Sequence, residues 1–174
     1  NCSFCTIVNV QGRKMRHRSA PAMLRSIEEN HARGFHVYFF TDDNLARSPV
    51  WEALFDGLID LRRRGKPVRF MMQIDTQAWH IPRFVEKAAA AGCYAVFIGM
   101  ESVNPANLEA AGKKQNKTGE FAGMVAAWHQ AHVLVHVGYI IGLPHDTEES
   151  VRQDVATLKD EIKVDQASFF MLTP

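Results

Sequence analysis

Short apolar runs alternate with longer amphipathic stretches along almost the whole chain, and this alternation constrains the fold more than any other feature. The short runs have the length and composition of strands, whereas the longer stretches repeat apolar residues at helical spacing. Strands joined through helices run parallel, with right-handed crossovers that cover the sheet. The expected strands span residues 36–40, 68–74, 94–98, 134–141 and 167–171.

Helices are expected between these strands, and turn residues mark several of their ends. Gly34, Gly65 and Gly92 follow the first three helical stretches, as glycine commonly does after a helix. The stretches span residues 21–34, 48–65, 82–92, 104–112, 118–131 and 147–162, with Ser19 and Ser48 as expected caps of the first two. The pattern predicts an α/β fold, a partial (β/α) barrel of parallel strands with residues 1–174 in one domain. A doubly wound open sheet would show the same alternation, so the pattern leaves both folds open.

Length and composition exclude little beyond membrane-spanning proteins. The chain has 174 residues, of which 47% are apolar and 22% charged, so it can bury one substantial core. Its formal net charge of +1 gives no bulk electrostatic reason to expect nucleic acid or an anionic membrane as partner. No apolar run approaches the ~20 residues that span a bilayer, and the first residues do not resemble a signal peptide. A cytoplasmic protein without a transmembrane segment is expected.

Polar or conformationally special residues follow every expected strand. These segments are residues 41–44, 73–76, 99–102, 142–144 and 172–174. In parallel α/β folds ligands bind at the carboxyl ends of the strands, where the loops leave the sheet and helix amino-termini point toward the opening. Turn formation or helix capping would explain any one of these loops. Several such loops together favour a binding site at this end.

Cys2 and Cys5 form a CxxC pair at the start of the chain. Two thiolates at this spacing bind one metal centre from a tight turn, and zinc sites, redox pairs and iron–sulfur clusters all use it. A further cysteine upstream would complete CxxxCxxC, a spacing that leaves one cluster iron open to a small molecule. Cys93 begins an expected strand at the opposite end of the sheet, where a packed core thiol is the favoured interpretation.

Residues 1–5 and the basic continuation 12–19 resemble the cluster loop of radical S-adenosylmethionine (radical SAM) enzymes, most of all the branch that often carries an upstream cobalamin-binding domain. Residues 39–44, 97–105 and 138–144 are similar to the second-strand segment, the fourth-strand motif and the GxIxG segment of that branch, in the same order. The resemblance covers nearly the whole chain. It implies a catalytic barrel truncated at both ends and lacking the first cluster cysteine, and therefore inactive by itself, because two thiolates do not hold a cuboidal cluster firmly.

The resemblance also implies the cofactors and the residues that bind them. In such enzymes a reduced 4Fe-4S cluster passes one electron to S-adenosylmethionine, and the resulting 5′-deoxyadenosyl radical abstracts a substrate hydrogen. Cobalamin would be bound by an upstream domain. Cys2 and Cys5 are the implied iron ligands. The implied S-adenosylmethionine site comprises Phe4 against the adenine, Asp42, Asp43 and Asn44 where the family usually has Gly-Gly-Glu, Glu101 and Ser102 near the ribose, Lys113 for the carboxylate, Gly142 near the adenine, and Gln73, Leu143, Pro144 and Met171 at other strand ends.

The expected function is therefore reductive cleavage of S-adenosylmethionine, leading to methylation or cyclisation of a lipid, pigment or natural product, with a reductant protein such as flavodoxin or ferredoxin as partner. Two alternatives stay open: an RNA methylthiotransferase of the same superfamily, and a non-catalytic module in which the CxxC pair holds zinc. The basic run 13–18 could bind phosphate, although a solvated loop is favoured and nucleic acid is not the expected partner. His129, His132 and His136 show no metal-ligand spacing.

Overall fold

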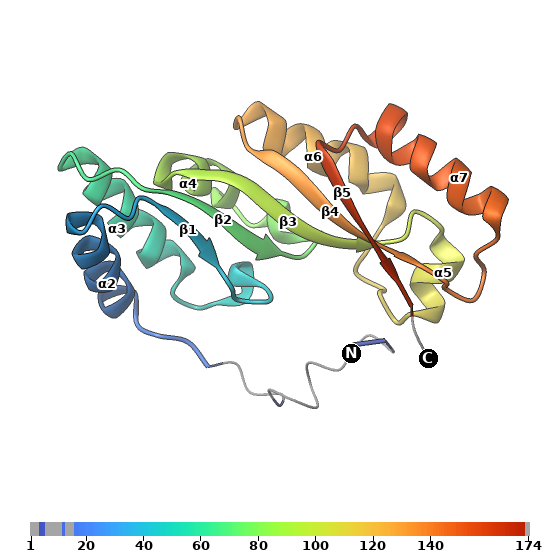
Figure 1. Ribbon diagram of the computed structural model, residues 1–174, viewed down its shortest axis with the longest axis horizontal. Helices are drawn as coiled ribbons and strands as arrows, with labels where there is room; N and C mark the ends of the chain where they lie inside the picture. Colours follow the sequence, from blue (N-terminus) through green and yellow to red (C-terminus); the bar gives the residue numbers. More distant parts are fainter. Residues whose placement is uncertain (1–3, 6–11, 13–15, 173–174) are drawn as a thin grey trace.

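The structure, a computed structural model, describes residues 4–5, 12 and 16–172, and within them it contains a five-stranded sheet (Figure 1). The strands are β1 (Val37–Phe40), β2 (Arg69–Ile74), β3 (Cys93–Glu101), β4 (Leu134–Ile141) and β5 (Gln166–Met171). They lie side by side in chain order, and every neighbouring pair is parallel. All five strands therefore end at the same edge of the sheet, which we call the carboxyl end.

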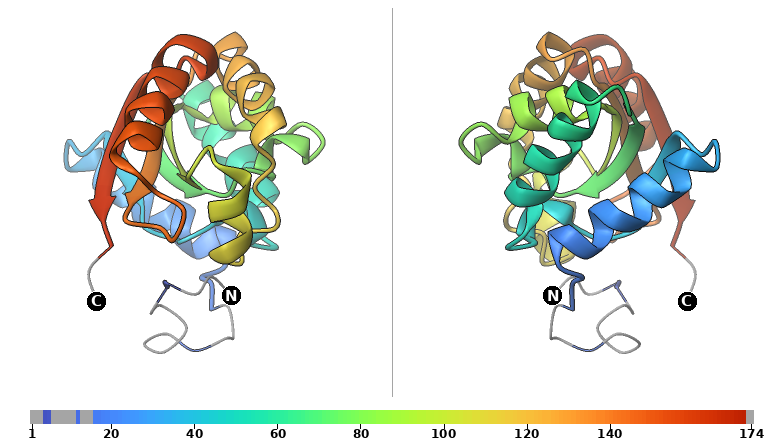
Figure 2. Two further views of the ribbon diagram at one scale, coloured as in Figure 1. Left: turned by 90° about the vertical axis from the view of Figure 1, so that its right-hand side faces the viewer. Right: turned by 90° about the vertical axis from the view of Figure 1, so that its left-hand side faces the viewer.

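The strand order decides between the two folds that the sequence left open. In a doubly wound sheet the strand order reverses at a switch point and helices cover both faces. Here the order never reverses, so right-handed crossovers place the helices on one face, as in a (β/α) barrel. Figure 2 shows the helices as an arc around the outside of the curved sheet. The predicted partial barrel is confirmed, and the open sheet is excluded.

Helices connect the strands as the alternation predicted. They are α2 (Ala20–Ala32), α3 (Trp51–Arg63), α4 (Phe84–Ala91), α5 (Pro105–Ala110), α6 (Phe121–Gln130) and α7 (Glu148–Ala156). Helix α7 continues into the π-helical segment η4 (Thr157–Ile162), and the 3-10 helices are η1 (Leu45–Arg47), η2 (Ala78–His80) and η3 (Thr118–Glu120). In the described part of the chain, no helix combines the length and the apolar character that a bilayer span requires.

Some predicted boundaries were wrong, each for a local reason. Ser48 does not cap α3: the N-cap is Val50, and the buried Ser48 offers only its carbonyl to the Trp51 amide. Helix α4 begins at Phe84 rather than near residue 82, because Arg83 has a left-handed backbone with φ 63°. Strand β3 continues three residues beyond its predicted end, because residues 99–101 still pair with β4. Helix α7 begins where expected, and Thr147 is its N-cap, accepting a hydrogen bond from the Ser150 amide.

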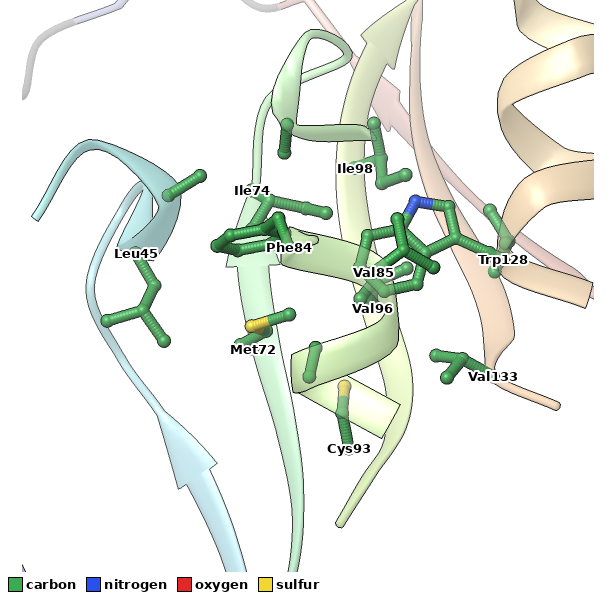
Figure 3. Close-up of a cluster of buried hydrophobic side chains, with 14 of the residues drawn as sticks. Leu45, Met72, Ile74, Phe84, Val85, Cys93, Val96, Ile98, Trp128 and Val133 are labelled. Carbon is green, nitrogen blue, oxygen red and sulfur yellow. The ribbon is translucent and has the colours of Figure 1, made fainter. Parts of the chain in front are cut away.

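The main core lies between the helices and the convex face of the sheet. Along β2 the side chains alternate, with Met72 and Ile74 buried on the helix side and their neighbours partly exposed on the other side. Figure 3 shows how Phe84 of α4 and Trp128 of α6 meet this face of the sheet near Val96. Each such side chain contributes about 1.5–3 kcal/mol when fully buried. This core fixes the helices on one face and leaves the concave face toward the barrel interior.

Candidate functional site

An ion pair between Glu101 and Lys113 lies above Gly99 at the carboxyl end of β3. Lys113 Nζ is 2.7 Å from Glu101 Oε1, and both side chains are 13% exposed. A Cβ atom at Gly99 would lie 2.6 Å from that carboxylate oxygen and 3.3 Å from the ammonium. The missing side chain of Gly99 therefore leaves the space in which the two charged groups meet. These are two of the residues that the sequence predicted for one site, and the structure brings them into contact.

The backbone at Glu101 is strained in a way that the sequence did not reveal. Its φ is 68°, in the left-handed region that residues other than glycine seldom adopt. The register between β3 and β4 also shifts between Gly99 and Glu101, as at a β-bulge. Strain of this kind costs of order 1–3 kcal/mol and persists only where the surroundings impose it. A strained acidic residue at the carboxyl end of a barrel strand is typical of a functional site.

Asn116 connects the loops that follow β2 and β3, and sequence reasoning missed it. Its side chain is buried and donates to the carbonyls of Gly99 (3.0 Å) and Met100 (2.8 Å). Its Oδ1 accepts a hydrogen bond from the buried Thr76 hydroxyl at 2.9 Å. Nothing in the short polar segment around Asn116 distinguishes it from a surface residue, because its partners are distant in sequence. This one amide fixes the turn that carries Glu101.

Ser102 lies behind the site rather than at its surface. The side chain is fully buried, and its hydroxyl accepts a hydrogen bond from the Asn104 amide at 3.0 Å. Tyr139 of β4 also interacts with Ser102, and its own hydroxyl donates to Asp154 of α7. Burial raises the pKa of both Tyr139 and Asp154. This buried group connects the loop after β3 to β4 and α7, and the ribose contact expected of Ser102 stays a prediction.

The loop after β4 is shaped by Asp146. Gly142 has φ 101°, a conformation that glycine adopts without strain. The Asp146 carboxylate accepts hydrogen bonds from the amides of Gly142 (2.8 Å) and Leu143 (2.9 Å), and from the Asn107 side chain at 2.6 Å. Asn107 is fully buried and also accepts from the His145 amide. Asn107, another residue that the sequence did not single out, therefore connects α5 to this loop.

Phe4, the second of the two residues between the cysteines of the CxxC pair, packs at the same place. It contacts a small buried cluster formed by Ala111, Ile140 and Leu143. Cys5 directly follows it and is a half-buried free thiol. Cys2 lies outside the described residues, as do Arg13 and Lys14 of the basic run. The amino-terminal turn thus reaches the loop after β4, as the predicted site requires.

The thiols differ in a way that agrees with the sequence analysis. Cys93 is buried at the start of β3, and burial raises its pKa to about 12. A thiol of this kind is a poor metal ligand, because ligation needs the thiolate. Among the described residues, no group of three or more His, Cys, Asp or Glu side chains is arranged to hold a metal ion. A thiolate-bound centre at the Cys5 turn fits the chemistry of the residues present, since thiolate is the ligand that iron–sulfur clusters use.

The loops after β1 and β2 meet through Asp75. Its carboxylate accepts hydrogen bonds from the Asn44 side chain at 2.8 Å, from Arg47 at 3.0 Å and from the Gln77 amide at 3.0 Å. Asn44 Oδ1 is buried and has no hydrogen-bond partner among the described residues. Asp42 is half-buried and Asp43 is exposed. Of these three predicted residues, only Asn44 has a described side-chain hydrogen bond, and it is made to the loop after β2.

The other predicted residues lie at the rim or inside the barrel. Gln73 is half-buried and in register with Phe97 on the concave face. Pro144 is exposed beside the buried Leu143, and Met171 is 67% exposed at the end of β5. The structure therefore brings together Phe4, Glu101, Lys113, Gly142 and Leu143 through α5 and the residues that follow it. Gln73 and Met171 lie outside this group.

Comparison with known proteins decides the family. A model of the radical SAM superfamily matches residues 1–158. The chain belongs to the radical SAM superfamily. The match covers the CxxC turn, the Glu101–Lys113 pair and the Gly142 loop, so the site described above is part of the radical SAM barrel.

Relatives and solved structures agree with this assignment. The chain is 27% identical to bacteriochlorophyllide d C-12(1)-methyltransferase of Chlorobaculum tepidum, over 99% of this chain and 38% of the relative. It is also 27% identical to tryptophan 2-C-methyltransferase of Streptomyces laurentii, over 88% of this chain and 27% of the relative. The chain thus spans 27% to 38% of the length of such curated relatives.

A structural comparison gives the same fold. The radical SAM methyltransferase TsrM from Kitasatospora setae, solved with cobalamin and a 4Fe-4S cluster bound, matches with a TM-score of 0.79 and 21% identity, over 98% of this chain and 34% of that one. The cobalamin-dependent radical enzyme OxsB matches with a TM-score of 0.75 and 15% identity, over 95% of this chain and 25% of that one. At these identities the likeness concerns the fold alone.

Proposed function

We propose that the protein binds a 4Fe-4S cluster and S-adenosylmethionine at the carboxyl end of the sheet and belongs to a cobalamin-dependent radical methylase or cyclase. The observation that carries this proposal is the convergence at α5. Asn107 of α5 contacts the loop after β4, and Ala111, one residue past the helix end, lies in the cluster against which Phe4 packs. Lys113 then pairs with Glu101 at the end of β3. One short segment thus joins the cysteine turn to both loops.

The residues of the site have complementary roles in this proposal. Cys2 and Cys5 hold iron, and the bound cluster and S-adenosylmethionine together supply the radical that removes a substrate hydrogen. Lys113 binds the cofactor carboxylate, because a cation favours an anion, and Glu101 accepts hydrogen bonds from ribose hydroxyls. Phe4 and the Gly142 backbone lie beside the adenine. Leu143 supports Phe4 from below through their shared cluster.

The loop after β1 departs from the usual Gly-Gly-Glu pattern of the family. Asn44 in this loop offers an acceptor in place of the missing glutamate. A buried acceptor without a partner is costly, and each one calls for an explanation. Asn44 Oδ1 is such an acceptor, on a side chain already oriented by Asp75. We assign it, with Asp42 and Asp43 beside it, to the cofactor amino group.

The names of the relatives support a proposal for the substrate class of the whole protein. Two of them, by name, methylate a bacteriochlorophyllide and one methylates tryptophan, so we propose a pigment or natural product with a conjugated ring as substrate. Electrons would come from a reductant protein such as flavodoxin or ferredoxin in the cytoplasm. We place residues 1–174 within one catalytic barrel.

A pair of cysteine variants tests the proposal. The protein, with whatever flanks this sequence in its gene, is reconstituted anaerobically with iron and sulfide. It should show iron–sulfur absorption and form 5′-deoxyadenosine from S-adenosylmethionine. Cys5→Ala should lose both, whereas Cys93→Ala should keep both, because Cys93 is a buried core thiol. Zinc without iron in the purified protein, or equal activity of both variants, would contradict the proposal.

A further inference from the structure

The concave face of the sheet is mostly apolar and open to the barrel interior. Residues in register across parallel strands share a face, so Phe39, Met71 and Leu134 lie toward the interior at one level. Phe170 lies there nearer the carboxyl end. Phe39, Leu134 and Phe170 are 53%, 53% and 51% exposed. A polar side chain on this mostly apolar face therefore calls for an explanation.

His136 and Ser168 form a polar pair within this apolar face. His136 Nε2 lies 2.8 Å from the Ser168 hydroxyl on the neighbouring strand. The ring of Phe97 meets the His136 ring edge to face, with centroids 4.9 Å apart. Burial lowers the pKa of His136, so the imidazole is neutral at neutral pH. With Nε2 engaged by Ser168, Nδ1 has no hydrogen-bond partner among the described residues.

A purely structural role does not account for this pair. Strands β4 and β5 are already joined by six register pairs, so they need no side-chain link. A packed interior position would favour an apolar residue, as at most other positions of this face. The free Nδ1 of a neutral imidazole instead offers a hydrogen-bond donor when Nε2 accepts from serine.

The position of His136 relative to the cofactor site is also favourable. Gly99, directly below the Glu101–Lys113 pair, is in register with Gly138. His136 precedes Gly138 by two residues on the same face, roughly 7 Å deeper along the strand. A Cβ at Gly138 would lie 2.9 Å from the Phe97 ring and 3.4 Å from Phe170. The absence of a side chain at Gly138 thus leaves room for the rings of Phe97 and Phe170.

We propose that His136, oriented by Ser168, is a substrate-positioning residue that donates a hydrogen bond to an oxygen substituent of a flat conjugated molecule lying against Phe97 and Phe170. This inference rests on the proposed function, because it assumes that the substrate enters the barrel interior below the cofactor. It narrows the substrate class to conjugated rings that carry a carboxylate or carbonyl at the edge. Gln73, in register with Phe97, lies at the same level.

Two conservative variants distinguish a substrate-positioning role of His136 from a purely structural role. In His136→Asn the side-chain amide nitrogen takes the place of Nδ1, whereas in His136→Gln it takes the place of Nε2, the atom that contacts Ser168. The probe is protoporphyrin IX, a flat conjugated dicarboxylic acid, with its dimethyl ester as matched control. Binding is followed by fluorescence quenching in protein carrying its natural flanking sequence. It requires neither cluster nor S-adenosylmethionine.

The expected result is specific to one nitrogen. His136→Ala and His136→Gln should bind the acid about tenfold more weakly, while His136→Asn stays within about threefold of the unaltered protein. The ester should bind with little difference among the variants. Preserved binding in His136→Gln with loss in His136→Asn, equal binding in all variants, or no saturable binding of the acid would each overturn the inference.

A second readout keeps this inference distinct from the proposed function. Formation of 5′-deoxyadenosine without substrate should be the same in His136→Asn, His136→Gln and the unaltered protein, because His136 does not contact the cofactor. If no protein forms it, the proposed function fails, yet the binding series still decides the role of His136. If only the histidine variants lose it, His136 belongs to the cofactor site and the inference is wrong.

Discussion

The two ends of the sheet use polar residues differently. At the carboxyl end they are buried and bonded to groups distant in sequence, as Asn116 is to Thr76 and Asn107 is to Asp146. At the amino end they are exposed or half-exposed, as in the contacts of Glu28 with Arg64 and Lys66. The buried polar side chains of the described residues are Ser48, Thr76, Ser102, Asn107, Asn116 and Asp154, and each lies in a loop or helix that follows a strand.

This difference between the two ends indicates that the functional site lies at the carboxyl end of the sheet. Exposed charges at helix ends mostly complement the helix dipole, as Arg62 and Arg63 do in the last turn of α3. Buried polar groups cost free energy unless they are fully bonded, so their concentration at one end indicates a selected geometry. Each prediction below challenges this difference, in order of decreasing effect.

The largest effect is expected for Asn116→Ala. The change removes three hydrogen bonds and leaves the carbonyls of Gly99 and Met100 without their partner. We expect about 3 kcal/mol of lost unfolding free energy in urea titrations, because unsatisfied buried groups are costly. The same substitution at Asn30, in the last turn of α2 at the amino end, should cost less than about 0.5 kcal/mol. Equal losses of unfolding free energy in the two variants would contradict the difference between the two ends of the sheet.

A double-mutant cycle at the ion pair should give the next largest effect. Glu101→Gln leaves Lys113 largely buried without a carboxylate, so we expect about 2 kcal/mol of destabilisation. Lys113→Met in the same protein should recover most of this loss, since it removes the unpaired charge. Unfolding free energies of the four proteins give the coupling. Strictly additive single effects would show that the two groups do not interact.

Asp154→Asn should change how stability depends on pH. Burial raises the Asp154 pKa, with Tyr139 and Asp146 facing it, so the folded state binds the proton more tightly than the unfolded state does. The unaltered protein therefore loses stability as pH rises from the ordinary carboxyl pKa through the raised one. The variant should lack this loss in unfolding free energies measured as the pH rises above the ordinary carboxyl pKa of about 3.9. An unchanged slope would contradict the assignment.

Glu28→Gln should have the smallest effect on stability, and its pH dependence should be opposite in sign to that at Asp154. The hydrogen bond from Lys66 and the nearby Arg64 lower the Glu28 pKa, so its stabilisation is present above the ordinary carboxyl pKa and is lost as pH falls through the lowered one. The pair is exposed, so added salt should weaken the effect further. Unfolding in low and high salt checks this. A loss of unfolding free energy as large as that of Glu101→Gln would contradict the difference between the two ends of the sheet.

Local pattern predicted most of the fold, and long-range contacts explain what it missed. Gly34, Gly65 and Gly92 follow helices with positive φ, as expected from single residues. The extension of β3 to Glu101 depends on pairing with β4, which no local pattern contains. Likewise, Val50 rather than Ser48 caps α3, because Ser48 is buried in the preceding turn.

The same distinction applies to the site. Glu101 and Gly142 could be predicted because they lie in strand-end segments that resemble the family, and Lys113 because of the same resemblance. Asn107 and Asn116 could not, because their partners lie 16 to 40 residues away in sequence. The interior pair of His136 and Ser168 was missed for the same reason, as its members lie on different strands.

Hydrogen exchange with and without S-adenosylmethionine tests the central claim most directly. The reconstituted protein, with its natural flanking sequence, is compared in the two conditions by mass spectrometry. We expect slower exchange in peptides covering residues 97–104 and 138–146 at the carboxyl end, and no change in those covering 30–37 and 62–69 at the amino end. Slower exchange confined to the amino end, or none at the carboxyl end, would contradict the account.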